Sequence, residues 1–81
     1  MDEVWEAARD DTLRRDGFQC VAHMRGVAPW VRCGFGLHVH HVLPRGRGGR
    51  HELDNLVSLC GRHHDWVHSH PAEAREHDLY R

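Results

Sequence analysis

A chain of 81 residues is long enough for one domain but buries only a limited core, and domains of this size commonly need a metal ion, a disulfide or a partner for stability. Its three cysteines form an odd number, which excludes a complete disulfide framework and favours metal binding in a reducing compartment. The net charge of −1 is unevenly distributed along the chain. Residues 17–50 carry five arginines and no acid, whereas residues 1–16 and 51–81 each carry six acids and three arginines. The central basic segment therefore suits a phosphate-bearing partner.

The composition also bears on partners and location. Every basic residue is an arginine, which favours forked contacts with phosphate, although a compositionally biased genome would give the same usage. No basic and apolar leader follows Met1, and no apolar run approaches the length that spans a bilayer. We therefore expect a soluble, cytoplasmic protein without a membrane partner.

The first predicted element is a helix over residues 2–15. Its apolar residues, among them Val4 and Trp5, recur at intervals of three and four between charged residues, and its first turn is acidic, as the helix dipole favours. Gly17 ends this helix. Residues 18–36 contain glycines and no clear periodicity, so we expect an irregular loop or knuckle there.

The middle of the chain predicts a hairpin followed by a helix. Residues 37–43 are typical of a strand, and residues 55–59 supply a second short one. Between them, residues 44–50 form a surface loop, because a proline and three glycines cannot continue a strand. A helix over residues 62–69 follows, and Pro71 can open a further helical turn.

Histidines at helical spacing indicate a cation site. His64 and His68 are four residues apart on the predicted helix, so both imidazoles lie on one face and can share a cation. His40, at the end of the first strand, is the best third ligand, and His38 on the same strand face is the alternative. Three neutral nitrogen ligands leave coordination positions open, which is typical of catalytic rather than structural sites. The competing interpretation of the pair alone is a solvated helix face.

A second metal site is predicted from two Cys-x-x-His knuckles. Cys20 and His23 form the first, Cys60 and His63 form the second, and these four ligands can complete a tetrahedral zinc shell. The gap between the knuckles is too long for a DNA-reading finger, so the zinc would be structural and would contribute to folding. Cys33 is a rival ligand, but it lacks a partner at knuckle spacing and is expected to be a core or free thiol.

Together these motifs resemble the HNH endonucleases. The resemblance covers roughly residues 14–70 and rests on the runs Arg15–Cys20, Leu37–Arg45, Gly48–Gly49, Asp54–Cys60 and His63–His68. The three letters of the family fall on His41, Asn55 and His64. Many members have Cys-x-x-Cys in both knuckles, whereas this chain has histidine as the second ligand of each.

The resemblance implies a small α+β fold, the ββα-metal finger, with an N-terminal helix and a structural zinc site. The whole chain, residues 1–81, would be a single HNH nuclease domain. Its parts are the N-terminal helix at about 2–15, the knuckle and ββα core at about 17–70, and a short helical tail at 71–81. The implied activity is hydrolysis of DNA phosphodiester bonds with one divalent cation.

The resemblance also suggests roles for individual residues. His41 would be the general base, because a neutral imidazole can accept a proton near physiological pH, and Asn55 would hold its segment in position. The cation would be Mg²⁺, Mn²⁺, Ni²⁺ or Zn²⁺. It would be held by the predicted ligands His40, His64 and His68. Neighbouring residues of a strand point to opposite faces, so the strand must end or bend at His40 and His41 if both approach one phosphate.

The remaining expectations concern partners. The loop arginines Arg45, Arg47 and Arg50 would bind DNA backbone phosphates, and a solvated, flexible loop is their alternative. The protein would act as a monomer or homodimer, and phage packaging or host defence proteins are further partners that the resemblance allows. A zinc-stapled DNA-binding or interaction module without cleavage activity is the alternative function. The three remaining histidines lack a partner at ligand spacing and are expected to be solvated: His51, His70 and His77.

Overall fold

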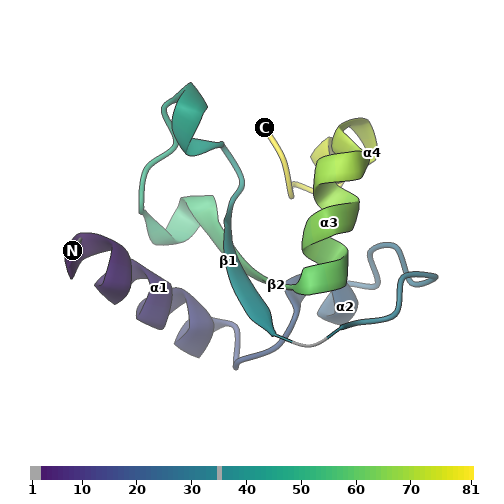
Figure 1. Cartoon of the computed structure of the whole chain (residues 1–81), viewed down its shortest axis with the longest axis horizontal. Coiled ribbons are helices and arrows are strands. Elements are labelled where there is room, and N and C mark those ends of the chain that lie inside the picture. The colour runs from purple at the N-terminus through teal and green to yellow at the C-terminus, as the bar shows by residue number, and fades with distance from the viewer. Residues whose placement is uncertain (1–2, 35) are drawn as a thin grey trace.

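A two-stranded hairpin followed by a helix forms the centre of the protein (Figure 1). The computed structural model describes residues 3–34 and 36–81. Strand β1 (Leu37–His41) pairs antiparallel with β2 (Leu56–Cys60), and helix α3 (Gly61–Ser69) follows β2 directly. The predicted small α+β fold with a ββα unit is therefore confirmed.

The register of the hairpin determines where its histidines lie. His40 lies opposite Val57 and His41 lies opposite Leu56. Strand β1 ends at His41, two residues earlier than expected, and β2 runs one residue beyond its predicted end. Both histidines lie within the paired strand, so their side chains leave it on opposite faces, and β1 ends directly after them.

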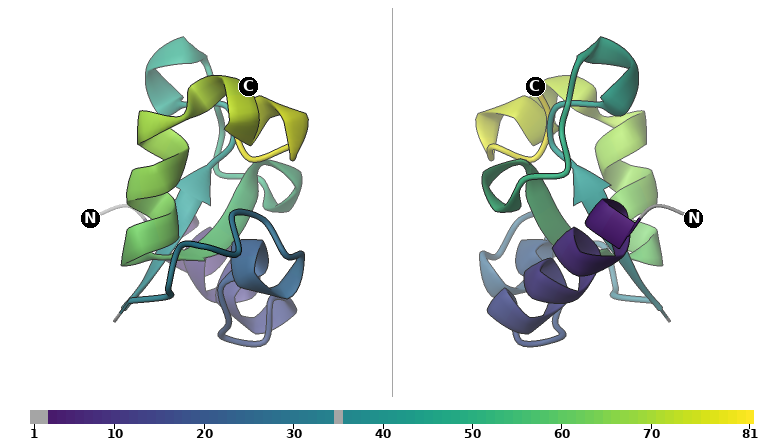
Figure 2. Two further views of the ribbon diagram at one scale, coloured as in Figure 1. Left: turned by 90° about the vertical axis from the view of Figure 1, so that its right-hand side faces the viewer. Right: turned by 90° about the vertical axis from the view of Figure 1, so that its left-hand side faces the viewer.

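Helix α1 (Glu3–Arg15) lies on the opposite side of the hairpin from α3, as the two views of Figure 2 show. The helix was expected over residues 2–15, and Asp2 lies outside the described residues. The Arg15 guanidinium donates to the carbonyl oxygens of Leu53 and Leu56, each at 2.6 Å. This arginine therefore ties the end of α1 to the start of β2.

A carboxylate reinforces the same junction. Asp16 accepts from the Ser58 backbone N–H of β2 at 2.9 Å and from Arg15 Nε at 2.8 Å. Burial would raise the pKa of Asp16, but the hydrogen bonds from Arg15 and Ser58 outweigh it and lower this pKa. The α1 side of the hairpin is thereby fixed by charge-assisted hydrogen bonds.

The core lies around β2, all five residues of which are buried. Two short helices complete it: α2 (Val21–Met24), inside the segment expected to be irregular, and α4 (Pro71–Glu76), in the predicted C-terminal tail. After α4, Leu79 is fully buried and the Arg81 N–H donates to the Val42 carbonyl at 2.9 Å. The C-terminal segment thus returns to the end of β1. None of the helices in the described part of the chain is long and apolar enough to cross a membrane.

Candidate active site and metal centres

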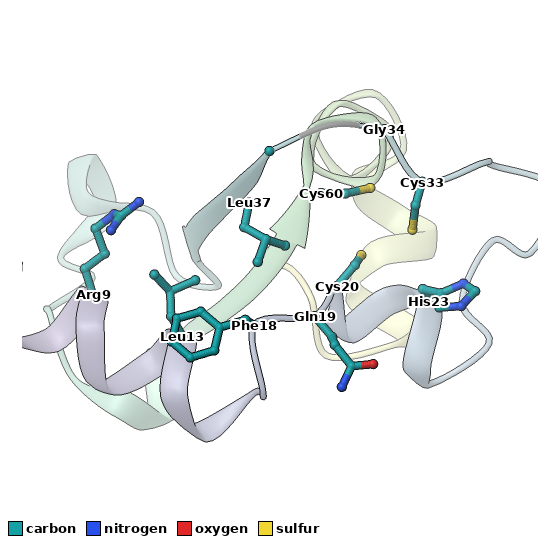
Figure 3. A pocket seen from close by; sticks show the side chains of 11 residues that line it. Arg9, Leu13, Phe18, Gln19, Cys20, His23, Cys33, Gly34, Leu37 and Cys60 are labelled. Carbon is teal, nitrogen blue, oxygen red and sulfur yellow. The ribbon is translucent and has the colours of Figure 1, made fainter.

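Three thiols and one imidazole form a compact group, here called the thiol cluster: Cys20, Cys33, Cys60 and His63. One ligand atom from each residue lies within 4.8 Å of the other three. Cys20 precedes α2, Cys60 caps the N-terminus of α3, and Cys33 comes from the loop before β1. Figure 3 shows the three sulfur atoms converging at one side of a 600 Å³ pocket.

The His63 ring is oriented toward these thiols. Its Nδ1 lies 3.2 Å from Cys60 Sγ and 3.5 Å from Cys33 Sγ, while its Nε2 lies 3.4 Å from the Ala28 carbonyl oxygen. An N–H at Nε2 can donate to that carbonyl, which leaves the lone pair on Nδ1 for a cation. Metal-binding histidines commonly have this kind of outer hydrogen bond.

The electrostatics of the thiol cluster fit a bound cation. Burial would raise the pKa of the Cys60 thiol, but hydrogen bonds from the backbone N–H groups of His63 and Gly34 help lower it to about 6. Burial and the neighbouring Cys60 and Cys20 thiols raise the pKa of Cys33. Thiolates this close repel one another unless a cation lies among them. Three sulfur ligands and one nitrogen match the ligand set of a structural zinc site.

The predicted zinc ligand His23 does not belong to this cluster, and Cys33 takes its place. In the second knuckle, the His63 N–H donates to Cys60 Sγ at 3.4 Å, and the helix turns the His63 ring back to the thiol. In the first knuckle, Cys20 makes no such cap, and His23 is exposed on α2 with its ring directed away from the sulfur atoms (Figure 3). Equal Cys-x-x-His spacing therefore produces two different side-chain directions.

A second group, here called the imidazole cluster, consists of His40, His64 and His68. One ring nitrogen from each lies within 4.8 Å of the others, and His64 Nε2 is 3.2 Å from His68 Nε2. His40 is buried on β1, whereas His64 and the exposed His68 are on α3. These are the three nitrogen ligands expected from the helical spacing and the strand end.

Burial and the closeness of the rings favour the neutral form of the imidazoles in this cluster, which is the form that binds a cation. Burial lowers the pKa of His40 to about 4, against a hydrogen bond to the Leu79 carbonyl. Burial also lowers the pKa of His64, and His68 adds to this effect. Both rings are therefore neutral at pH 7, the form that binds metal ions. His40 Nε2 lies 2.7 Å from the Leu79 oxygen, so an N–H there leaves the lone pair on Nδ1.

His38 lies beside the imidazole cluster rather than in it. Its exposed ring stacks on that of His64, with 5.1 Å between centroids and 8° between planes. The alternation of β1 places His38 on the face of His40, as the sequence indicated. The three-nitrogen group nevertheless forms without it.

His41 points toward α1 but still borders the imidazole cluster. Its ring stacks on Trp5 with 5.2 Å between centroids, and its Nε2 lies 2.9 Å from His51 Nδ1. His41 and Arg45 line a 260 Å³ depression together with all three members of the imidazole cluster. Burial lowers the pKa of His41, and His51 and Arg45 add to the shift. A neutral imidazole is thus placed beside a candidate cation site.

Sequence spacing gave no indication of the role of His51. It was expected to be solvated, but its ring is partly buried between the imidazole of His41 and the indole of Trp5. His70 and His77 are exposed as expected, and the His70 ring also stacks on Trp66 with 5.2 Å between centroids. The contact between His41 and His51 joins the two ends of a long loop, so local periodicity carries no signal of it.

Asn55 closes that loop with three hydrogen bonds. Its side-chain oxygen accepts from the Leu43 N–H at 2.8 Å, and its amide donates to the carbonyls of Leu43 and Arg50, each at 3.1 Å. A Cβ at Gly49 would overlap the Leu43 carbonyl, so this close approach of the chain requires glycine. The asparagine therefore fixes the segments on either side of the loop.

The three loop arginines occupy different surroundings. Arg45 borders the imidazole cluster in the 260 Å³ depression. The Arg47 guanidinium donates to the Arg81 backbone oxygen at 2.9 Å, and Arg50 lines a second depression, which also includes Arg45 and His51. Of the three arginines expected to bind phosphate, Arg45 therefore lies beside the candidate reaction site.

We expect Asn55→Ala to destabilise the protein by ~2–4 kcal/mol, because the backbone groups of Leu43 and Arg50 lose three hydrogen bonds to the side chain of the buried Asn55. Chemical denaturation with zinc present measures this effect. Asp54→Ala is the matched control, since Asp54 is exposed on the short helical turn Leu53–Asn55 that also carries Asn55, and its cost should stay below ~0.5 kcal/mol. An equal, small effect of both substitutions would contradict the structural role of Asn55.

Comparison with protein families gives a match over residues 31–70 to the model of the HNH endonucleases. The matched segment contains β1, β2 and α3 and therefore the whole imidazole cluster, together with His41 and Asn55. Comparison with curated proteins and with solved structures gives no significant match. The family implies metal-dependent nuclease activity in general, and its nucleases use divalent cations.

Proposed function

On the premise that residues 31–70 belong to the HNH endonuclease family, we propose that this protein hydrolyses phosphodiester bonds of DNA. The observation that carries the proposal is the 260 Å³ depression, where the imidazole cluster, His41 and Arg45 meet. Hydrolysis of a phosphodiester needs a base for water, a bound phosphate and a positive charge near the phosphoryl oxygens. The depression supplies a candidate for each requirement.

His40, His64 and His68 would hold the divalent cation, since their nitrogen atoms lie close together and the pKa values of two of them are lowered. When bound, the cation would stabilise negative charge on the phosphoryl and leaving oxygens. Two of the ligands come from one face of α3 and the third from β1. The packing of α3 on the hairpin therefore determines the geometry of the site.

His41 would act as the general base and Arg45 would bind a phosphate. The His41 ring is held against Trp5, and its lowered pKa keeps it neutral and able to accept a proton at physiological pH. Arg45 is exposed at the rim of the same depression, in a segment with no acidic residue. Its guanidinium can donate two parallel hydrogen bonds to a phosphate. Arg47 and Arg50 would add contacts along the DNA backbone.

The proposal is tested by incubating supercoiled plasmid with the zinc-loaded protein, with and without added Mg²⁺ or Mn²⁺. We expect cleavage only with the added cation. His68→Ala should slow cleavage at least ~100-fold, because an exposed cation ligand is removed without disturbing the core. His77→Ala, which changes an exposed histidine beyond α4, is the matched control and should cut like the parent.

Two results would contradict the proposal. A wild-type protein that binds plasmid but cuts it with neither ion, nor with Ni²⁺ or Zn²⁺, would indicate a DNA-binding module. Equal cleavage by His68→Ala and the parent would remove the imidazole cluster from the mechanism. Isothermal titration with Mn²⁺ measures cation binding independently of cleavage in both variants.

A further inference from the structure

The contact between His41 and His51 raises the question of which nitrogen carries the proton. His41 Nε2 and His51 Nδ1 are 2.9 Å apart, so one of them donates a hydrogen bond to the other. If His51 donated, the remaining proton of a neutral His41 would lie on Nδ1, and neither ring nitrogen would be available as a base. If His41 donates from Nε2, its lone pair lies on Nδ1.

Resting on the proposed function, we propose that His51 is a positioning residue that accepts a hydrogen bond from His41 Nε2–H and thereby keeps the lone pair of the base on Nδ1. A third group that orients the base is a general feature of activated nucleophiles. A carboxylate is the usual orienting group in catalytic triads, whereas here a neutral imidazole would have this role. Nothing in the linear spacing of the two histidines indicates this pairing.

The surrounding contacts restrict both rings. Trp5 stacks on His41 at 5.2 Å and contacts His51 at 4.9 Å between centroids, so one indole from α1 packs against the pair. Asn55 bonds the backbone of Leu43, two residues after His41, and that of Arg50, directly before His51. The same asparagine therefore fixes both segments that carry the histidine pair. With rotation limited in this way, a tautomer can be maintained between turnovers.

The proton balance of the reaction follows from this assignment. Water would lose one proton to His41 Nδ1 as its oxygen forms the new bond to phosphorus and the bond to the leaving oxygen breaks, and the leaving oxygen would take up a proton from solvent. The protonated His41 would then donate a charge-assisted hydrogen bond from Nε2 to His51, which is stronger than the bond made by the neutral ring. His51 would stabilise the base most after proton uptake, and the proton would afterwards pass to solvent.

Three substitutions separate this role from simple packing. His51→Asn keeps an acceptor near the position of Nδ1, His51→Phe keeps a ring against Trp5 without an acceptor, and His51→Ala removes both. We expect kcat for plasmid nicking to fall at least ~10-fold in the Phe and Ala variants, as for other residues that orient a functional histidine. His51→Asn should stay within ~5-fold of the parent, and KM for DNA should change less than ~2-fold in all three.

Long-range ¹⁵N–¹H NMR of the imidazoles gives a readout that does not depend on cleavage. In the zinc-loaded protein without added cation, His41 should be the Nε2–H tautomer, and His51→Phe should shift it toward a mixture. An Nδ1–H tautomer in the parent would overturn the proposal, as would a Phe variant that cuts normally while the Asn variant does not. If the tautomer is as expected but the parent cuts no DNA, the proposed function fails while the orientation of His41 by His51 stands.

Discussion

Replacing Cys33 by serine is expected to reduce the zinc content of the protein from about one ion per chain to near zero and to destabilise the fold strongly. The reason is that Cys33 joins Cys20, at the start of α2, and Cys60 and His63, at the start of α3, so the four ligands link three separate parts of the chain. In a domain this small, the free energy of zinc binding contributes directly to folding. A loss of at least ~3 kcal/mol would lower the melting temperature by at least about 12 °C.

His23→Ala is the matched control for this experiment. The Cys-x-x-His spacing predicts His23 as a zinc ligand, but its side chain is exposed on α2 and lies outside the thiol cluster. We expect the zinc content and the melting temperature of the His23→Ala variant to stay close to those of the parent. Metal analysis of the purified variants, combined with thermal unfolding, decides between the two ligand sets. Loss of zinc in His23→Ala and its retention in Cys33→Ser would contradict the structural assignment.

The ββα unit could be predicted from the sequence because its signals are local. Pro44 and the glycines of the following loop interrupt two apolar runs, and Pro71 marks the end of the helix that carries His64 and His68. The four-residue spacing of these histidines also gives their common face directly. The expected fold class and the composition of the imidazole cluster both derive from such short-range patterns.

The thiol cluster could be predicted only in part, because one ligand depends on the path of a loop. Between α2 and β1 the chain turns through Gly26 and Ala28, both with positive φ, before Cys33 returns to the start of α3. No periodic pattern specifies that path. Gly34, whose N–H lowers the pKa of Cys60, was the available signal, since glycine after a cysteine permits close approach to a ligand.

The contacts of His41 could not be predicted from the sequence for a similar reason. Its partners Trp5 and His51 come from α1 and from the far side of the loop, and both contacts require the tertiary fold. The alternation of strand β1 directs the side chains of His40 and His41 to opposite faces. Both residues nevertheless line the 260 Å³ depression, which lies at the end of β1. The hydrogen bond from His40 to the Leu79 carbonyl is equally non-local.

The second large effect is expected for His41→Ala, which should slow DNA cleavage at least ~100-fold while leaving cation binding intact. Loss of a general base typically costs between about 10² and 10⁴ in rate. His41 lies outside the three-nitrogen group, so Mn²⁺ affinity should change less than ~3-fold. The ring stacks on Trp5, and thermal unfolding is therefore needed to show that the variant is folded under the assay conditions.

The most direct test of the nuclease assignment is single-turnover cleavage of supercoiled plasmid by the parent, His41→Ala and the control His77→Ala at saturating Mg²⁺ or Mn²⁺. We predict cation-dependent cutting by the parent and His77→Ala, and a folded, metal-binding His41→Ala that cuts at least ~100-fold more slowly. Cleavage by His41→Ala at the parental rate would contradict the role of His41. No cleavage by the parent with any of the divalent ions would contradict the assignment of this site as a nuclease.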